Sequence, residues 1–433
     1  MIMNEQTWNF VRQHRNDDVR KLALQKVKDQ ETDLSMALQQ IAGWQTARKK
    51  LPTWAAREGI VFPPHLNMEQ CSSEQTARYK QHLVERLMSE KGDTKAPNGD
   101  EMECFVDLTG GFGVDFYWMS QGFKQRCYIE QNANLCALAK HNFSVLGHKS
   151  TVVCGSAADF LPTLTHTSVV FIDPARRDEH GARTYGISDC TPNVLEMLPV
   201  LLVKGHFIVL KLSPMLDWRK AVNDLEEASL DPKAYVREVH IVSVDNECKE
   251  LLLVLSQEQT EQVMLTCVNN DTIFHAVSRA ETYGFLEGNR WFLRGKPKVS
   301  AVQKYDNEVD LVQRGYLYEP NASIMKAGCF RELEQQFPVR QLAANSHLFI
   351  SADEIADFPG RGFQISAISS MNKQGLKTTL QGIEKANISV RNFPMTADQL
   401  RKKLKLKDGG DVYIFATTMA DEQHKLFICR KIG

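Results

Sequence analysis

Residues 104–115 read Cys104-Phe-Val-Asp-Leu-Thr-Gly-Gly-Phe-Gly-Val-Asp115, an apolar run that leads into a glycine-rich turn. The apolar run predicts a β-strand, and the turn predicts the start of a helix. Glycines at such a turn let the backbone adopt positive φ angles and approach a ligand closely. Because a glycine pattern alone is weak evidence, its meaning depends on the sequence around it.

The sequence that follows predicts a sheet, because short apolar runs alternate with segments long enough for helices. The runs are Cys104–Leu108, Arg126–Glu130, Thr151–Cys154, Ser168–Ile172, His206–Leu212, Val236–Val244 and Glu250–Leu255. The spacing of the first five predicts parallel strands with crossover connections. Only residues 245–249 separate the last two, a length that suits a hairpin. The fold class predicted is α/β, a doubly wound sheet of seven strands with one antiparallel strand.

An acidic residue stands where a nucleoside cofactor would need one. Glu130 ends the second predicted strand, 19 residues after Gly111. An acid about 20 residues beyond such a turn suits hydrogen bonds to ribose hydroxyls. The alternative is a tight strand–helix connection that binds no ligand. Asp107, Glu130 and the predicted sheet agree independently, and together they favour the cofactor site.

Composition limits the other possibilities. The chain has 433 residues, which predicts two or three domains, and its net charge of −1 provides no global attraction for a polyanion. Any nucleic-acid surface must therefore be a local patch. The ten cysteines form no Cys-x-x-Cys pair, so we expect reduced thiols in a cytoplasmic protein, and no metal. We expect no signal peptide and no membrane span, because no suitable apolar run is present.

The regions before and after the predicted sheet have different patterns of apolar and polar residues. Before it, helices are predicted at Thr7–Gln13, Val19–Val27, Leu34–Lys49 and Ser73–Met88, followed by a polar linker at Ser89–Glu101. Strand-like pieces without helical rhythm occupy residues 257–335. From about residue 336 a second small α/β unit is predicted, with strands Gln364–Ile368, Ile388–Arg391, Val412–Thr417 and Lys425–Arg430 and helices Gly375–Lys385 and Ala397–Leu406.

The strand, turn and acid resemble class I S-adenosylmethionine-dependent methyltransferases, in which an acid ends the first strand and the turn reads roughly Asp-Leu-Gly-x-Gly-x-Gly. The resemblance covers roughly residues 66–256. Thr109 replaces the first glycine, as in ribosomal RNA guanine methyltransferases that carry Asp-x-Thr-x-Gly-x-Gly. The resemblance implies S-adenosyl-L-methionine as cofactor. It implies binding by Asp107, Thr109, Gly111, Gly113 and Glu130.

The resemblance also implies two less direct cofactor contacts. After the third strand the family places residues around the adenine; Ser156 replaces the usual acid, so the backbone of Ala157 or the side chain of Asp159 would serve. Before the first strand, Ser72 and Ser73 lie in a stretch like the motif that holds the methionine carboxylate. The alternative is that one of these serines caps the following helix, and both roles are compatible.

Asp173-Pro-Ala-Arg-Arg177 ends the fourth strand, at the edge that faces the transferred methyl group in this superfamily. Amino-directed nucleic-acid methyltransferases carry Asn/Asp-Pro-Pro-aromatic there, and the acid accepts a hydrogen bond from the target amine. Asp173 and Pro174 match that motif. Arg176 departs from it, but a guanidinium plane can stack on a base or hold a phosphate. We therefore assign Asp173, Pro174 and Arg176 to catalysis and Arg177 to substrate binding.

The Asp-Pro-Ala-Arg stretch also resembles the 5-methyluridine RNA methyltransferases, which use a cysteine nucleophile after the fifth strand. Leu212 stands where that cysteine would be, so covalent attack on a pyrimidine lacks its nucleophile. Cys190 is a possible replacement, but a buried thiol at a helix start is the preferred interpretation. Lys211 lies at the ligand-binding edge and is predicted to act in catalysis, a solvated lysine being the alternative.

Basic residues gather near the C-terminus, between Lys385 and Lys407, where Asp398 is the acid we weigh against them. We expect this patch to hold RNA phosphates, and the alternative is an ordinary solvated helix face. The substrate-binding residues predicted here are Arg391, Arg401, Lys402 and Lys403.

The layout resembles a bacterial family of methyltransferase-like proteins with a THUMP-like C-terminal domain. Shared stretches are Tyr316–Asn321, Asn387–Asn392 and Leu406–Gly410. The domains implied are a helical N-terminal region (1–92), the methyltransferase core (93–258), a small ferredoxin-like α+β domain (259–335) and the THUMP-like α/β domain (336–433). THUMP domains accompany RNA-modifying enzymes, so the resemblance implies an RNA substrate.

The function predicted is cytoplasmic methylation of ribosomal or transfer RNA. A base amino nitrogen is the preferred target, with direct methyl transfer and no covalent cysteine adduct. Two alternatives remain open. One is a methyltransferase of a small molecule or protein, and the other is a non-catalytic RNA-binding protein that retains cofactor affinity.

Overall fold

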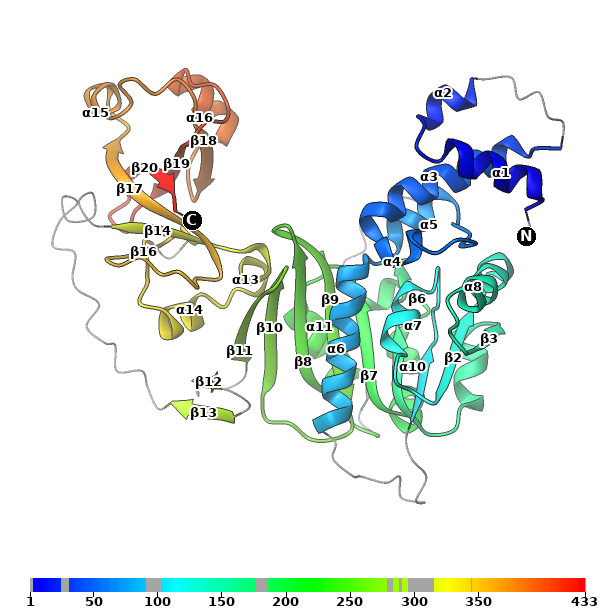
Figure 1. Ribbon diagram of the computed structural model, residues 1–433. Coiled ribbons are helices and arrows are strands. Elements are labelled where there is room, and N and C mark those ends of the chain that lie inside the picture. The colour runs from blue at the N-terminus through cyan, green and yellow to red at the C-terminus, as the bar shows by residue number, and fades with distance from the viewer. Residues whose placement is uncertain are drawn as a thin grey trace. The chain divides into compact units, whose positions relative to one another are not determined.

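The computed structural model describes most of the chain and divides into two compact units. The described residues are 3–24, 31–90, 103–176, 186–229, 231–278, 283–287, 290–294, 315–343 and 345–432. The first unit is Met1–Val239 with Glu250–Thr260, and the second is His240–Lys249 with Glu261–Gly433. Figure 1 shows the elements of both units.

Helices build the N-terminal part of the first unit. They are α1 (Glu5–His14), α2 (Val19–Ala23), α3 (Leu34–Lys50), α4 (Pro52–Ala55), α5 (His65–Gln70) and α6 (Glu74–Glu90). Side-chain oxygens of Asn4, Asp18 and Asp33 accept backbone N–H groups at the starts of α1, α2 and α3, so ordinary N-caps set where these helices begin. No helix in the described part of the chain is long and apolar enough to cross a lipid bilayer.

The sheet of the first unit confirms the predicted doubly wound α/β fold. Its strands are β1 (Cys104–Asp107), β2 (Gln125–Glu130), β3 (Thr151–Cys154), β4 (Thr167–Ile172), β7 (Gly205–Leu212), β8 (Tyr235–Val244) and β9 (Glu247–Ser256). Their order is β3-β2-β1-β4-β7-β9-β8, and two further strands extend the sheet beyond β8, so it has nine strands where seven were predicted. The first five are parallel, and β9 runs antiparallel to β7. The order reverses direction at β1 and β4, where doubly wound sheets bind ligands.

Helices connect these strands, and α6 crosses one face of the sheet (Figure 1). The connecting helices are α7 (Val114–Met119), α8 (Ala133–Val145), α9 (Ala157–Phe160), α10 (Val194–Lys204) and α11 (Trp218–Ala228). Strand β4 is buried along its whole length, which explains the apolar run that forms its last four residues, Val169–Ile172. A short pair, β5 (Ala175–Arg176) with β6 (Cys190–Thr191), follows β4.

The predicted hairpin between β8 and β9 is present, but its turn is tighter than the sequence suggested. Strand β9 begins at Glu247, so Asp245 and Asn246 alone make the turn. Both residues have positive φ angles, 51° and 62°. Two-residue turns of this kind match the right-handed twist of the paired strands, and Asn and Asp tolerate the conformation.

The second unit holds the remaining strands. Strand β10 (Val263–Asn269) lies next to β8 in the sheet, and β11 (Thr272–Ser278) lies next to β10. Strand β12 (Tyr283–Glu287) pairs with β13 (Arg290–Arg294) in a separate two-stranded sheet. A seven-stranded sheet of order β15-β16-β14-β17-β20-β19-β18 forms the C-terminal part. Its strands are β14 (Tyr316–Pro320), β15 (Arg340–Gln341), β16 (Phe349–Ser351), β17 (Gly360–Ser370), β18 (Asn387–Arg391), β19 (Val412–Thr418) and β20 (His424–Lys431).

Among the described residues, four helices accompany this sheet, and one of them is shorter than predicted. They are α13 (Ala322–Ala327), α14 (Phe330–Gln336), α15 (Lys373–Thr379) and α16 (Ala397–Leu404). The sequence predicted a helix to Lys385, which is wrong because α15 ends at Thr379. Gly382 adopts a φ of +81°, and Lys385 forms a β-bridge with Lys407, so the chain leaves the helix to approach the sheet.

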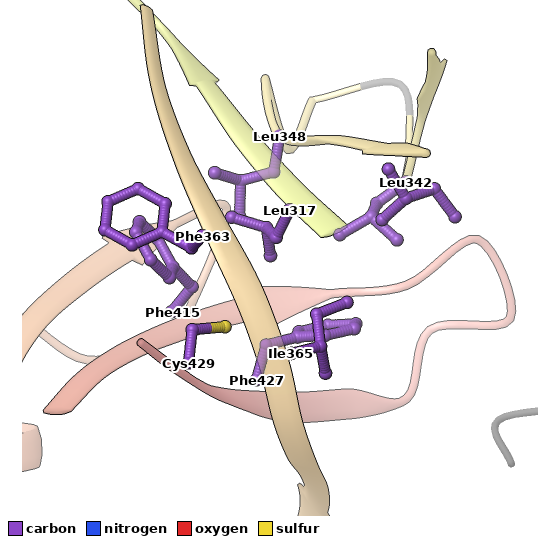
Figure 2. Packing of buried hydrophobic residues seen from close by; sticks show 9 residues of the cluster. Leu317, Leu342, Leu348, Phe363, Ile365, Phe415, Phe427 and Cys429 are labelled. Carbon is purple, nitrogen blue, oxygen red and sulfur yellow. The ribbon is translucent and has the colours of Figure 1, made fainter. Parts of the chain in front are cut away.

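Figure 2 shows one core of the C-terminal sheet, where side chains from β14, β17, β19 and β20 converge. Leu317 on β14 is fully buried against Phe363 and other apolar residues of this cluster. Alternation along the strands explains the core, because every second residue faces it.

We expect Leu317→Ala to lower the free energy of unfolding by about 2–5 kcal/mol, because the truncation removes buried methyl groups and leaves a cavity. Urea unfolding measures the change. Ile273→Ala is the control, since this aliphatic side chain is 51% exposed. Equal stability of the two variants would contradict the core packing described.

Candidate functional site

Four of the predicted site residues meet at one edge of the first unit's sheet. Asp107 ends β1, Glu130 ends β2, Asp173 follows β4, and Lys211 lies next to the last residue of β7. These strands are parallel, so their carboxyl ends share an edge. The edge is where doubly wound sheets bind their ligands.

The glycine turn after β1 has the backbone shape that its sequence predicts. Gly111 and Gly113 have φ angles of +56° and +87°. The carboxylate of Glu130 accepts hydrogen bonds from the backbone N–H of Gly111 (2.9 Å) and of Asn132 (2.8 Å). The hydroxyl of Tyr128 donates to the carbonyl of Gly111 at 2.6 Å. Hydrogen bonds with Tyr128 and Glu130 of β2 therefore hold the glycine turn in place.

Glycines at this edge leave room that a nucleoside cofactor requires. A Cβ added to Gly111 would meet nothing nearer than the Thr109 carbonyl oxygen at 3.8 Å, and one added to Gly155 would meet nothing within 4 Å. At Gly110, in contrast, an added Cβ would lie 2.0 Å from the Tyr128 ring, so that glycine serves packing. Open backbone beside the Glu130 carboxylate suits a ribose-bearing ligand, and these residues fit the predicted cofactor.

Thr109 connects the glycine turn to the chain that follows β4. Its backbone N–H donates to the Asp107 carboxylate at 2.9 Å, and its hydroxyl oxygen accepts the backbone N–H of Asp173 at 2.7 Å. Asp107 is buried, and burial raises the pKa of its carboxyl well above the usual range. The threonine that departs from the glycine pattern thus has a structural role, which the sequence did not reveal.

Lys211 lies at the centre of a buried polar cluster. Its ammonium contacts the carboxylates of Asp173 (2.7 Å) and Asp115 (3.2 Å). It also donates to the hydroxyl oxygen of Ser72 at 3.0 Å. Lys211 itself is 9% exposed, so the alternative of a solvated lysine does not describe this side chain.

A second lysine completes the cluster from the helix α6. Lys80 is fully buried and forms ion pairs with Asp115 (3.1 Å) and with Glu250 of β9. Ser72 lies between them, within hydrogen-bond distance of Asp115 (2.7 Å) and Glu250 (2.9 Å). We call these residues the charge cluster; its members are Ser72, Lys80, Asp115, Asp173, Lys211 and Glu250.

The charges of the cluster oppose the effect of burial. Burial lowers the pKa of Lys211, but Asp115, Asp173 and Glu250 raise it more, so its pKa lies well above the usual range. Burial raises the pKa of Asp115, but Lys211 and Lys80 outweigh this and bring it to about 2. Burial raises the pKa of Asp173, and Lys211 only partly offsets the shift. Lys211 is therefore an ammonium and no general base at neutral pH.

Sequence reasoning did not identify Lys80, Asp115 or Glu250 as site residues. A signal for Lys80 exists in hindsight, because it falls at helical spacing among the buried residues Ala77 and Val84 of α6. A lysine on an apolar helix face needs a buried counter-ion. Nothing local marks Glu250 as that partner, since it lies 170 residues away in the chain.

The two serines before the sheet have separate roles. The hydroxyl oxygen of Ser73 accepts the backbone N–H of Thr76 at 3.1 Å, which is the capping role weighed for this stretch. Ser72 is buried, and its hydroxyl forms hydrogen bonds within the charge cluster. A cofactor contact of either serine remains a prediction.

The remaining residues predicted at this edge are placed as follows. Ala157 is buried at the start of α9, while Asp159 is exposed and accepts a hydrogen bond from the Ser156 hydroxyl (2.8 Å). Pro174 is buried. The backbone of Arg176 pairs with Cys190 between β5 and β6. Arg177 lies outside the described residues.

The basic residues predicted to bind RNA divide into two kinds. Arg391 is paired with the buried carboxylate of Glu319 at 2.8 Å. Arg401 is paired with Asp398 (2.7 Å) and Asp408 (2.6 Å). Lys402 and Lys403 are exposed and form no ion pair within the described part of the chain. Their role in RNA binding remains a prediction for all four.

Known proteins share the domains and the fold of this chain. Residues 316–359 match the family model of a ferredoxin-like domain, and residues 360–431 match that of a THUMP domain-like family. The sequence had placed the ferredoxin-like part at 259–335. A crystal structure from Porphyromonas gingivalis W83, described provisionally as a methyltransferase, is 29% identical, with full coverage of both chains and a TM-score of 0.76.

Two curated relatives come from Mycobacterium tuberculosis, strains CDC 1551 / Oshkosh and ATCC 25618 / H37Rv. Both are described as uncharacterised S-adenosylmethionine-dependent methyltransferases. Each is 22% identical over 287 residues, which is 65% of this chain and 68% of the relative.

We expect Glu130→Gln to weaken binding of S-adenosylhomocysteine roughly ten- to a hundred-fold, because the amide removes the charge that strengthens hydrogen bonds to ribose hydroxyls. Isothermal titration calorimetry measures the affinity. Gln131→Ala is the control, since Gln131 is the exposed neighbour of Glu130 in the chain. Unchanged affinity of the Glu130 variant would rule out its cofactor role.

We expect Asp115→Asn to lower the free energy of unfolding at pH 7 by roughly 3–5 kcal/mol, because two buried ammonium groups lose a shared counter-ion. The pKa of Asp115 in the folded state, about 2, lies below its ordinary value of 3.8. The unfolded chain therefore takes up the proton first, and this contribution of Asp115 is lost as the pH falls from about 4 towards 2.

Urea unfolding of both proteins at pH 7 and at pH 3 tests this expectation. The stability difference between the wild type and Asp115→Asn should be smaller at pH 3. A difference that stays the same or grows at pH 3 would show that the Asp115 charge does not stabilise the fold.

Proposed function

We propose that this chain, a S-adenosylmethionine-dependent methyltransferase with ferredoxin-like and THUMP-like domains after its α/β core, methylates a base of ribosomal or transfer RNA. The match of residues 360–431 to the THUMP domain-like family is the observation that supports an RNA substrate. Domains of the THUMP type accompany RNA-modifying enzymes. The exposed Lys402 and Lys403 on α16 supply positive charge that suits RNA phosphates.

Asp173 is the group we propose to receive the target base. When bound, S-adenosylmethionine supplies a methyl group activated for attack by a nucleophile. The Asp173 side chain is 38% exposed, so it is accessible at the edge, whereas Lys211 behind it is buried. A carboxylate there accepts a hydrogen bond from the N–H of an amino nitrogen and aims the lone pair of that nitrogen.

The proton released by N-methylation also needs an acceptor. The nitrogen that gains a methyl group carries an additional positive charge until it loses a proton. Asp173 is suited to take that proton, because its carboxylate is accessible and partial burial raises the pKa of that carboxyl. Lys211 keeps its own proton throughout, and its ammonium holds Asp173 in place at 2.7 Å.

Direct methyl transfer without a covalent enzyme adduct is the second part of the proposal. Leu212 stands where the 5-methyluridine enzymes carry their cysteine, and it is buried. Cys190 is the alternative nucleophile, because its backbone pairs with Arg176 near Asp173. It is 2% exposed, which leaves little access for a base.

We expect RNA from cells that lack the gene to miss one methylated nucleoside, detected by mass spectrometry of digested RNA. The purified protein should restore it with labelled S-adenosylmethionine. Asp173→Asn should reduce the rate on the order of 100-fold, since it removes the charge that stabilises the reacting nitrogen.

Cys190→Ala is the matched control and should retain activity without forming an RNA adduct on denaturing gels. Loss of activity in the cysteine variant, with intact cofactor binding, would favour covalent catalysis. An RNA pool identical in both strains would reject RNA as the substrate.

A further inference from the structure

The N-terminal helices and α8 line a half-open cavity of about 690 Å³ that the methyl-transfer edge does not use. Its lining comes from α1, α3, the segment that follows α4, and α8. The residues that matter for its chemistry are Trp8, Arg12, Arg15, Trp44, Arg57 and His141. The volume lies within the range typical of small-molecule sites, about 300–1,000 Å³.

The lining combines flat aromatic rings with guanidinium groups. The Arg15 guanidinium lies 4.8 Å from the centroid of the Trp44 ring, as a cation–π pair, and both residues line the cavity. The guanidinium of Arg48, which does not line the cavity, makes a second cation–π contact with the same ring at 5.1 Å. The Trp44 indole N–H donates to the carbonyl of Ala55 at 3.1 Å, which fixes the ring. Aromatic rings and arginine planes are the surfaces on which nucleobases stack.

The arginines of the cavity are not committed to carboxylates. Within the described residues, Arg12, Arg15 and Arg57 form no ion pair. Glu5 and Glu58 also contribute to the lining, so the lining residues carry three guanidinium groups and two carboxylates. This differs from the C-terminal patch, where both predicted arginines are already paired. Uncommitted guanidinium groups are the usual ligands of phosphate.

We infer that this cavity is a nucleotide-binding site, separate from the methyl-transfer edge, in which an aromatic base stacks against the Trp44–Arg15 pair. The phosphate of the nucleotide is held by Arg12 and Arg57. The ligand is a nucleotide within a single-stranded RNA or a free nucleotide, and the chemistry that recognises them is the same. The RNA form of the inference rests on the proposed function.

The cavity is packed against the cofactor turn. Phe62 lines it, and the Phe62 ring lies 6.5 Å from the ring of Phe112, which stands between Gly111 and Gly113. Trp54, fully buried, contacts the same Phe112 ring edge-on at 5.0 Å. An RNA strand held in the cavity is therefore anchored to the element that binds the cofactor.

Binding of a fluorescein-labelled ten-nucleotide single-stranded RNA, followed by anisotropy, tests the inference, with AMP as the competitor. Arg15→Glu and Arg57→Glu should each weaken RNA binding about tenfold or more, a typical effect of losing a stacking or phosphate contact. Arg20→Glu is the matched control, because Arg20 is exposed on α2 and does not line the cavity. It makes the same change of charge and should have little effect.

Competition by AMP, with the same loss in the two cavity variants, would show that a single nucleotide suffices. RNA binding that AMP does not compete, but that the cavity variants weaken, would show a nucleotide held within a strand. Cavity variants that bind both RNA and AMP as Arg20→Glu does would overturn the inference. Unchanged affinity for S-adenosylhomocysteine confirms that each variant is folded.

The outcome is separable from that of the proposed function. If AMP binds through the cavity arginines and RNA from the deletion strain misses no methylated nucleoside, the proposed function fails and the nucleotide site stands. If RNA is methylated but the cavity variants bind normally, the nucleotide site fails alone.

Discussion

The contact of the Lys211 ammonium with Asp173 and Asp115 is the interaction on which the first unit depends. The charge cluster contains two buried ammonium groups and three carboxylates. Removing any one of these charges from water without an oppositely charged partner would cost a large free energy of desolvation. Their mutual attraction offsets that cost only while all members are present. Lys80 comes from α6, Glu250 from β9 and Asp115 from α7, so the cluster joins the N-terminal helices to the sheet as it orders the edge. The proposed catalytic geometry and the stability of the first unit consequently depend on the same few charges.

The sequence predicted the fold where burial alone determines the pattern. Strand β4 is buried along its whole length and ends in four consecutive apolar residues, and its predicted start differs from the observed one by a single residue. Predictions were less accurate where the backbone conformation of one or two residues decides the outcome. The turn at Asp245 and Asn246 is such a place, and so is the end of α15, where Gly382 takes a positive φ. Neither depends on hydrophobic periodicity.

Prediction of the site followed a similar division. The meeting of Asp107 and Glu130 at one edge was predictable, because the topology of parallel strands alone brings their carboxyl ends together. Ion pairs between residues distant in the chain were not predictable, since the sequence shows which residues are charged but not which residues they pair with. Arg391 illustrates this: it counts towards a basic patch in the sequence, yet the structure pairs it with Glu319. The arginines around Trp44 attracted no notice in the sequence, yet none of them has a carboxylate partner in the described residues.

The bond between the Thr109 hydroxyl and the Asp173 backbone has a consequence for protein engineering. Substituting the residue most common in relatives is a standard route to stabilised variants. At position 109 that procedure would introduce glycine and improve the match to the family motif. It would also release the only hydrogen bond described between the turn and the Asp173 amide, so an average over the superfamily is a poor guide to this enzyme. Residues that depart from a motif deserve protection in a library until their partners are known.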